Sequence, residues 1–145
     1  MSFEESEHPE REAEWNREQR ANVLEYLAGA GVAQADVPRE PTWSASPHLA
    51  IWPVRSSVQP HATGWWVISG DVPTDYVSSS EIPNERAAMR VFARRWMKAS
   101  RRMARGEKPE DFQIGRPNEW KSLAPMLASR AKLLAEWAAD DDLWS

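Results

Sequence analysis

Three segments of the chain repeat apolar residues at the three- and four-residue spacing of an amphipathic helix, which predicts helices over residues 10–28, 81–105 and 123–139. The middle segment has the clearest apolar stripe, made of Ala88, Val91, Phe92, Trp96, Ala99 and Met103. Each segment follows a serine placed three residues ahead of a proline, in the pairs Ser6 and Pro9, Ser80 and Pro83, and Ser122 and Pro125. We interpret these serines as helix N-caps, because a serine oxygen accepts from orphan amides and proline is tolerated in the first turn.

Between the first two helices the pattern changes to short apolar runs separated by proline and serine. Residues 49–52 predict a strand that ends at Pro53 on a sheet edge, because proline donates no ladder hydrogen bond. Residues 64–69 are almost fully apolar, which predicts a strand covered on both faces. We interpret residues 55–63 as a hairpin loop. The pattern also predicts short flanking strands at residues 42–43 and 75–77.

These elements together predict an α+β fold, in which a small antiparallel β-sheet (a hairpin plus short flanking strands) is packed by three α-helices. The chain has 145 residues, which suits a single domain over residues 1–145. We expect residues 1–9 and 140–145 to be flexible tails, residues 107–121 to form a loop, and Trp144 to dock back onto the domain.

Composition narrows the chemistry. The chain contains no cysteine, which excludes disulfides, thiolate metal sites and a cysteine nucleophile, and agrees with a cytoplasmic location. We expect no signal peptide, because the first residues are acidic, and no membrane segment, because the apolar runs are short. The three histidines lack metal-ligand spacing, and there is no phosphate-binding glycine loop or nucleophile elbow. We therefore expect no metal and no cofactor, and favour a protein that is not an enzyme.

Charge is separated along the chain. Residues 81–105 carry eight basic and two acidic side chains, a net charge of +6, whereas residues 1–25 carry a net charge of −5 and the whole chain −4. The simplest interpretation is a solvated helix face. Nucleic-acid binding is disfavoured, because such sites interleave basic groups with aromatic rings, whereas Phe92 and Trp96 belong to the apolar stripe. Recognition of an acidic partner protein stays open.

Nine tryptophans, at positions 15, 43, 52, 65, 66, 96, 120, 137 and 144, are many for this length. We favour a core built on large rings, although two or three of them lining a groove for a ligand or partner is compatible with that core.

The most informative stretch is residues 64–76, where the apolar run passes directly into an acidic turn. Asp71 and Asp75 are paired carboxylates, a pattern used in general acid–base catalysis and in binding hard cations. The favoured alternative is structural, because aspartate in a turn often bonds its own backbone. If the stretch forms a ligand site, its candidate residues are Trp65, Trp66, Asp71, Asp75, Tyr76 and Arg86.

Several runs resemble one known family over nearly the whole chain. They are Trp15 with Gln19 and Arg20, Tyr26 with Leu27, Pro41 with Trp43, Leu49 with Ile51 and Trp52, residues 64–76, residues 129–131, and Trp137 to Trp144. The chain in this respect resembles the short bacterial proteins of domain of unknown function 4826. The resemblance implies a bacterial, stand-alone, cytoplasmic protein and no assigned activity or catalytic residues.

Two functions therefore remain from the sequence. The first is a non-enzymatic protein-interaction or regulatory module, such as an adaptor, a regulator or a toxin-neutralising partner. The alternative is a small-ligand-binding or hydrolytic domain with its site at residues 64–76. The sequence defines neither the partner nor the oligomeric state.

Overall fold

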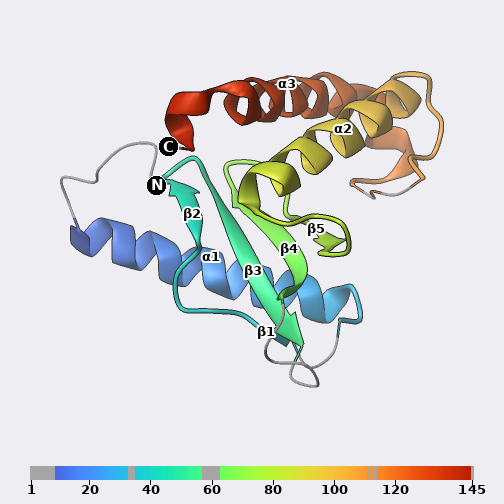
Figure 1. Ribbon diagram of the computed structural model, residues 1–145. Coiled ribbons are helices and arrows are strands. Elements are labelled where there is room, and N and C mark those ends of the chain that lie inside the picture. Colours follow the sequence, from blue (N-terminus) through green and yellow to red (C-terminus); the bar gives the residue numbers. More distant parts are fainter. Residues whose placement is uncertain (1–8, 33–34, 57–62, 111, 113, 145) are drawn as a thin grey trace. The chain divides into compact units, whose positions relative to one another are not determined.

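The computed structural model describes residues 9–32, 35–56, 63–110, 112 and 114–144 (Figure 1). The chain divides into two compact units, residues 1–85 and residues 86–145, which we describe separately. The first unit contains one helix and the sheet, and the second contains two helices joined by a loop. In the described part of the chain, no helix is long and apolar enough to cross a membrane.

The sheet of the first unit is antiparallel throughout, as predicted. Its strands are β1 (Ala35–Asp36), β2 (Trp43–Ala45), β3 (Leu49–Ser56), β4 (Thr63–Gly70) and β5 (Asp75–Ser78). The order is β1-β3-β4-β5, with β2 also paired to β3. The central hairpin β3–β4 places Ile51 opposite Ile68 and Trp52 opposite Val67. Most of the predicted loop between these strands, residues 57–62, lies outside the described residues.

Pro53 does not end its strand, which corrects the sequence interpretation. β3 continues through Pro53, which lies opposite Trp66 of β4. On its other side β3 pairs with β2 through residues 49–51 and with β1 through residues 55–56. Proline falls in the gap between these two short strands, where no ladder hydrogen bond has to be donated. The position is therefore a local edge within a central strand.

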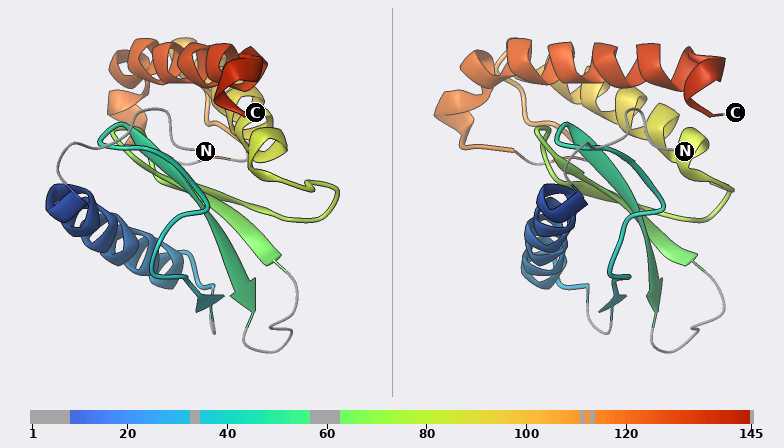
Figure 2. Two further views of the ribbon diagram at one scale, coloured as in Figure 1. Left: turned by 60° about the vertical axis from the view of Figure 1, so that its left-hand side comes forward. Right: turned by 90° about the vertical axis from the view of Figure 1, so that its left-hand side faces the viewer.

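One face of the sheet is covered by α1 (Pro9–Gly29), whose bounds agree with the predicted helix (Figure 2). The core between them consists of Val23, Leu27, Val37, Ala50, Trp52, Val54 and Val67. Trp15, Trp65 and Tyr76 pack against this core while staying partly exposed. At its centre the fully buried Trp52 donates from Nε1 to Ser69 Oγ at 3.0 Å.

The opposite face of the sheet is buried as well. It carries Leu49 and Ile51 of β3 and Trp66 and Ile68 of β4, none of which is more than 6% exposed. Trp66, Val67 and Ile68 are thus consecutive buried residues with alternating directions. This confirms the prediction that residues 64–69 form a strand covered on both faces.

In the second unit, α2 (Glu85–Ala104) and α3 (Trp120–Ala139) are joined by a loop that ends in the short turn η1 (Pro117–Glu119). The apolar stripe predicted for α2 is buried at Ala88, Phe92, Trp96, Ala99 and Met103, while Val91 is half-buried. The ring of Trp96 stacks on Phe112 of the loop, with centroids 5.8 Å apart. α3 buries Ala124, Leu127, Ala131, Leu134 and Ala138.

The serine caps expected for these two helices are wrong. α2 begins at Glu85, not at residue 81, because Glu81 adopts a left-handed φ of 63° that interrupts any helix there. α3 begins at Trp120, so Pro125 lies inside it, and Ser122 Oγ donates to the Glu119 carbonyl. The third expected cap, Ser6, lies outside the described residues, although Pro9 does open α1.

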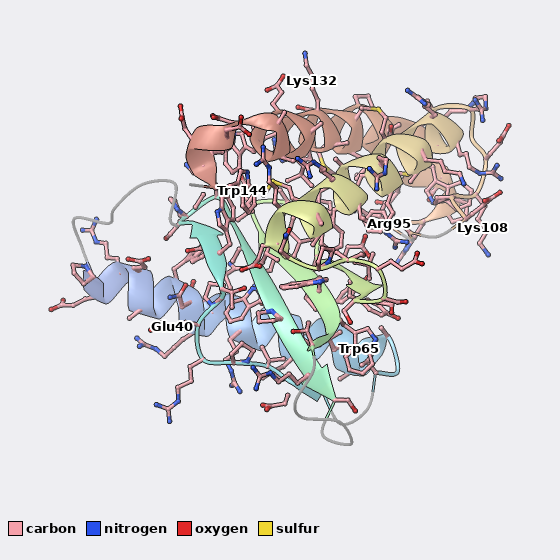
Figure 3. All side chains as sticks on the ribbon, in the orientation of Figure 1. Glu40, Trp65, Arg95, Lys108, Lys132 and Trp144 are labelled. Atoms are coloured by element: carbon pink, nitrogen blue, oxygen red, sulfur yellow. The ribbon has the colours of Figure 1, made fainter. Side chains whose placement is uncertain are left out.

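The chain end folds back onto α3 as expected for Trp144. Residues Asp141–Leu143 form the short turn η2, in which Asp140 Oδ1 accepts from the Asp142 amide at 3.1 Å. The indole of Trp144 donates from Nε1 to the Trp137 carbonyl at 3.0 Å (Figure 3). The other expected tail is residues 1–9, of which residues 1–8 lie outside the described residues and Pro9 begins α1.

Candidate functional site

The β4–β5 register decides how the predicted ligand residues are arranged. Trp66 lies opposite Val77, and Ile68 lies opposite Asp75, which puts Trp66 and Asp75 on one face of the sheet. Trp65 and Tyr76 lie on the other face, toward α1. The strand pair therefore brings these four residues into one hairpin but divides them between its two faces.

Asp75 is buried, at 2% exposure, and its Oδ1 accepts a hydrogen bond from the amide of Tyr76 at 2.8 Å. This is the turn-type bonding that the structural interpretation of the carboxylate predicts. Asp71, in contrast, is exposed and follows the end of β4. The two carboxylates thus occupy different environments, one inside the sheet and one in solvent.

The turn between them is fixed by a close backbone approach. The Asp71 amide donates to the His48 carbonyl at 2.7 Å. Gly70 has a φ of 128°, and a Cβ at this position would collide with the carbonyl oxygen of His48. Only glycine fits there, so Gly70 sets the direction in which the chain leaves β4.

The aromatic candidates on the α1 side act as packing residues. Tyr76 meets Tyr26 edge to face, with ring centroids 6.0 Å apart. Trp65 packs against the α1 core. Trp66, on the other face, donates from Nε1 to the Ile82 carbonyl at 2.9 Å and is 6% exposed.

Arg86 belongs to the second unit and is engaged there. Its Nε donates to the Ala138 carbonyl at 2.7 Å, and its Nη2 contacts Asp141 Oδ1 at 2.6 Å. Its guanidinium also lies 6.0 Å from the ring centre of Trp144. The hydrogen bond and the charge of Arg86 hold the pKa of Asp141 below its ordinary value, with a smaller contribution from the charge of Arg90. Arg86 thus ties the first turn of α2 to the end of α3.

A second candidate surface lies on α2, on the side away from its buried stripe. Arg90, Arg94 and Arg101 are exposed, and at 100° per residue they fall within a narrow arc of the helix, over about 16 Å of its length. We call these three residues the basic face. Within the described residues, none of the three has a hydrogen bond or an ion pair.

The basic side chains that flank this face are paired. Lys98 Nζ lies 3.5 Å from Glu110, and Arg105 Nε lies 3.2 Å from Glu107. The hydrogen bond and charge of Arg105 lower the pKa of Glu107. The sequence identified the positive helix, but it did not separate its paired members from its unpaired ones. Helical phase alone groups the three arginines, whereas the structure shows that they form no hydrogen bond or ion pair with the residues it describes.

No group of three or more histidine, aspartate or glutamate side chains that could hold a metal ion occurs in the described ranges.

Comparison with known proteins gives a single result. A family model described as "Domain of unknown function (DUF4826)" matches residues 9–144. The chain belongs to the DUF4826 family. No curated protein and no solved structure matches this DUF4826 chain. The match confirms the resemblance found in the sequence.

Proposed function

We propose that this DUF4826 protein is a non-enzymatic interaction module that binds an acidic partner protein through the basic face of α2. The observation that carries the proposal is the row of exposed guanidinium groups of Arg90, Arg94 and Arg101, which form no hydrogen bond and no ion pair within the described residues. Arginine presents a planar set of donors that matches carboxylates, so such a row favours aspartate and glutamate side chains at matching spacing. A cytoplasmic location and an adaptor or regulatory role are part of this proposal.

An acidic protein suits this surface better than nucleic acid does. The whole chain carries a net charge of −4, which opposes a long polyanion. The rings of α2 that could stack on bases, Phe92 and Trp96, are fully buried.

The strength of such binding is bounded by the exposure of the groups. Exposed ion pairs contribute roughly 0.2–1 kcal/mol each, so three of them alone support only weak association. We therefore expect the arginines to set orientation and association rate, with further contacts around them supplying affinity. Binding should weaken as salt screens the charges.

The test is affinity capture from a nuclease-treated lysate of the source cells, with the wild-type chain compared with the triple variant Arg90→Ala, Arg94→Ala, Arg101→Ala. Exposed helix positions tolerate alanine, so each change should alter stability by no more than about 0.5 kcal/mol. We expect the wild type to retain an acidic protein that the triple variant loses. The matched control removes three exposed cations elsewhere, at Arg11, Lys121 and Lys132, and should keep the partner. Lys132 is labelled in Figure 3.

Two results would contradict the proposal. One is capture of the same proteins by the wild type and the triple variant. The other is a complex that the wild type captures from an untreated lysate but not from the nuclease-treated one, which would indicate nucleic-acid binding.

The alternative of a ligand-binding or hydrolytic site at residues 64–76 stays a prediction. The bond from the Tyr76 amide to Asp75 favours the structural role of that carboxylate. Arg86 has its donors directed at Ala138 and Asp141.

A further inference from the structure

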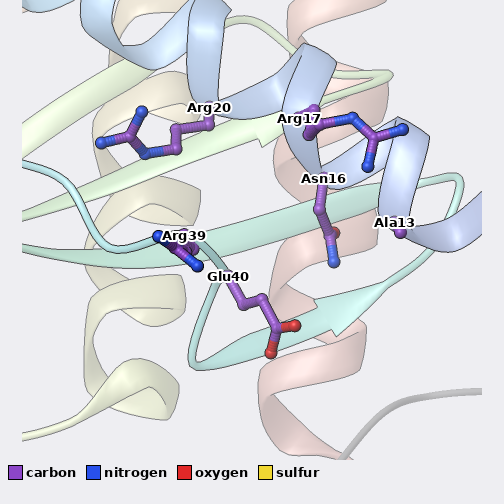
Figure 4. A pocket seen from close by; sticks show the side chains of 6 residues that line it. All are labelled: Ala13, Asn16, Arg17, Arg20, Arg39 and Glu40. Atoms are coloured by element: carbon purple, nitrogen blue, oxygen red, sulfur yellow. The ribbon is translucent and has the colours of Figure 1, made fainter.

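The first unit has a pocket of about 390 Å³ that the functions above do not use. It lies between α1 and the segment that leads into β2, and its lining consists of Ala13, Asn16, Arg17, Arg20, Arg39 and Glu40 (Figure 4). Its volume falls within the range of roughly 300–1,000 Å³ that is usual for small-molecule sites. Five of the six lining residues have polar or charged side chains, and three of these are arginines.

One of the three arginines is held in place by the backbone. Arg20 donates from Nε and Nη2 to the Val37 carbonyl, at 3.1 and 2.9 Å, and from Nε to the Pro38 carbonyl at 3.1 Å. Its Nη1 has no hydrogen bond to the described residues, so it keeps donors for a ligand. A guanidinium fixed in this way loses little conformational entropy when it binds an anion.

The other two arginines of the lining are exposed. Arg17 and Arg39 form no hydrogen bond and no ion pair with the residues that the structure describes. With Glu40 as the one acidic residue of the lining, the pocket has a formal charge of +2. Asn16 points toward Glu40 in Figure 4, and its Oδ1 is buried without a hydrogen-bond donor among the described residues.

We propose that this pocket binds a small phosphate monoester that also carries a hydroxyl group. The charge of +2 favours an anionic ligand such as a dianionic phosphate. The fixed guanidinium of Arg20 can donate to its oxygens, and Arg17 and Arg39 add positive charge around the pocket. Glu40 would repel a bare anion, but it is an acceptor for a hydroxyl on the same ligand. A hydroxylated phosphate therefore uses both kinds of lining group, whereas inorganic phosphate uses only the arginines.

The test is isothermal titration calorimetry at low salt with glycerol 3-phosphate, and with inorganic phosphate and glycerol for comparison. We expect glycerol 3-phosphate to bind at least tenfold more tightly than inorganic phosphate, and glycerol not to bind. The double variant Arg17→Gln, Arg39→Gln should weaken glycerol 3-phosphate binding at least tenfold. Arg11→Gln, an exposed change on the same helix outside the pocket, should bind as the wild type does.

Glu40→Gln tests the contribution of the ligand's hydroxyl group separately from that of its phosphate. It should weaken binding of glycerol 3-phosphate while leaving inorganic phosphate bound equally well or better, because a like charge is removed. No binding of glycerol 3-phosphate at millimolar concentration would overturn the proposal, as would equal losses in the Arg11 and Arg17/Arg39 variants. Equal affinity for both phosphates would overturn the role of the hydroxyl.

Ligand binding to the pocket is independent of the protein interaction proposed for α2. The triple variant of the basic face should titrate with glycerol 3-phosphate as the wild type does. The Arg17/Arg39 variant should still capture the acidic partner. Each proposal can therefore fail while the other stands.

Discussion

The hydrogen bond between Trp52 and Ser69 is the sharpest test of the sheet core. Both side chains are fully buried, and the indole Nε1 lies 3.0 Å from Ser69 Oγ. Ser69→Ala removes the acceptor and leaves the indole N–H unpaired in the core of the first unit, which costs about 1–3 kcal/mol. The change removes one oxygen, so its cost reports the unpaired donor more than lost packing.

A double-mutant cycle with Trp52→Phe isolates this bond from the ring volume. Trp52→Phe alone loses packing and leaves Ser69 Oγ without its donor. In the double variant both polar partners are gone. We therefore expect its loss of unfolding free energy to be about 1–2 kcal/mol smaller than the sum of the losses in the two single variants. The free energies of unfolding come from urea titrations followed by circular dichroism. Ser80→Ala, at an exposed position after β5 whose side chain makes no hydrogen bond to the described residues, is the control and should change stability by less than about 0.5 kcal/mol.

A neutral Ser69→Ala, or strictly additive single variants, would refute the reasoning. Either result would mean that the indole N–H finds another acceptor, or water, at no cost.

Three further predictions concern β4, the turn that follows it, and the end of the chain. Gly70→Ala should destabilise by more than about 2 kcal/mol in urea unfolding, because a Cβ would strike the His48 carbonyl and the φ of 128° is strained for alanine. Trp66→Ala should cost about 3–5 kcal/mol by the same assay, because the ring is 6% exposed; an unshifted melt would contradict its burial. Because Arg86 lowers the pKa of Asp141 in the folded chain, the ion pair stabilises above the ordinary carboxyl pKa of 3.8 and the stabilisation is lost as pH falls through the lower folded value. The melting temperature of the wild type should therefore exceed that of Asp141→Asn at neutral pH, and the gap should close with acid and shrink with salt.

The spacing of apolar residues predicted much of the fold, because it reports which side of a single helix or strand is buried. The consecutive apolar residues of β4 and the apolar stripe of α2 each follow from burial of one element, and both are confirmed. Pro53 was misinterpreted because its tolerance depends on where β1 and β2 stop along β3, which is a property of the whole sheet. Ser122 was misinterpreted because the chain forms a turn at residues 117–119 that lets α3 start earlier.

The candidate sites also combine features that the local sequence predicts with features that depend on the fold. The acidic turn after β4 was visible in the sequence, but the bond from the Tyr76 amide to Asp75 depends on the conformation of the turn. The arginine pocket was not visible, because Arg20 and the Val37 carbonyl that orients it are 17 residues apart and no motif marks the pair. Sequence periodicity placed Arg90, Arg94 and Arg101 on one helix, and the structure distinguished them from neighbours that are already paired.

The most direct test of the central claim is site-specific photo-crosslinking in the source cells. Ala104 is exposed at the end of α2, one turn from Arg101, and a benzoylphenylalanine placed there would sit at the edge of the basic face. We expect crosslinks from Ala104 to an acidic protein, and none to that protein from the same probe at Lys132 on α3. Crosslinks to nucleic acid, or identical crosslinks from both positions, would contradict it.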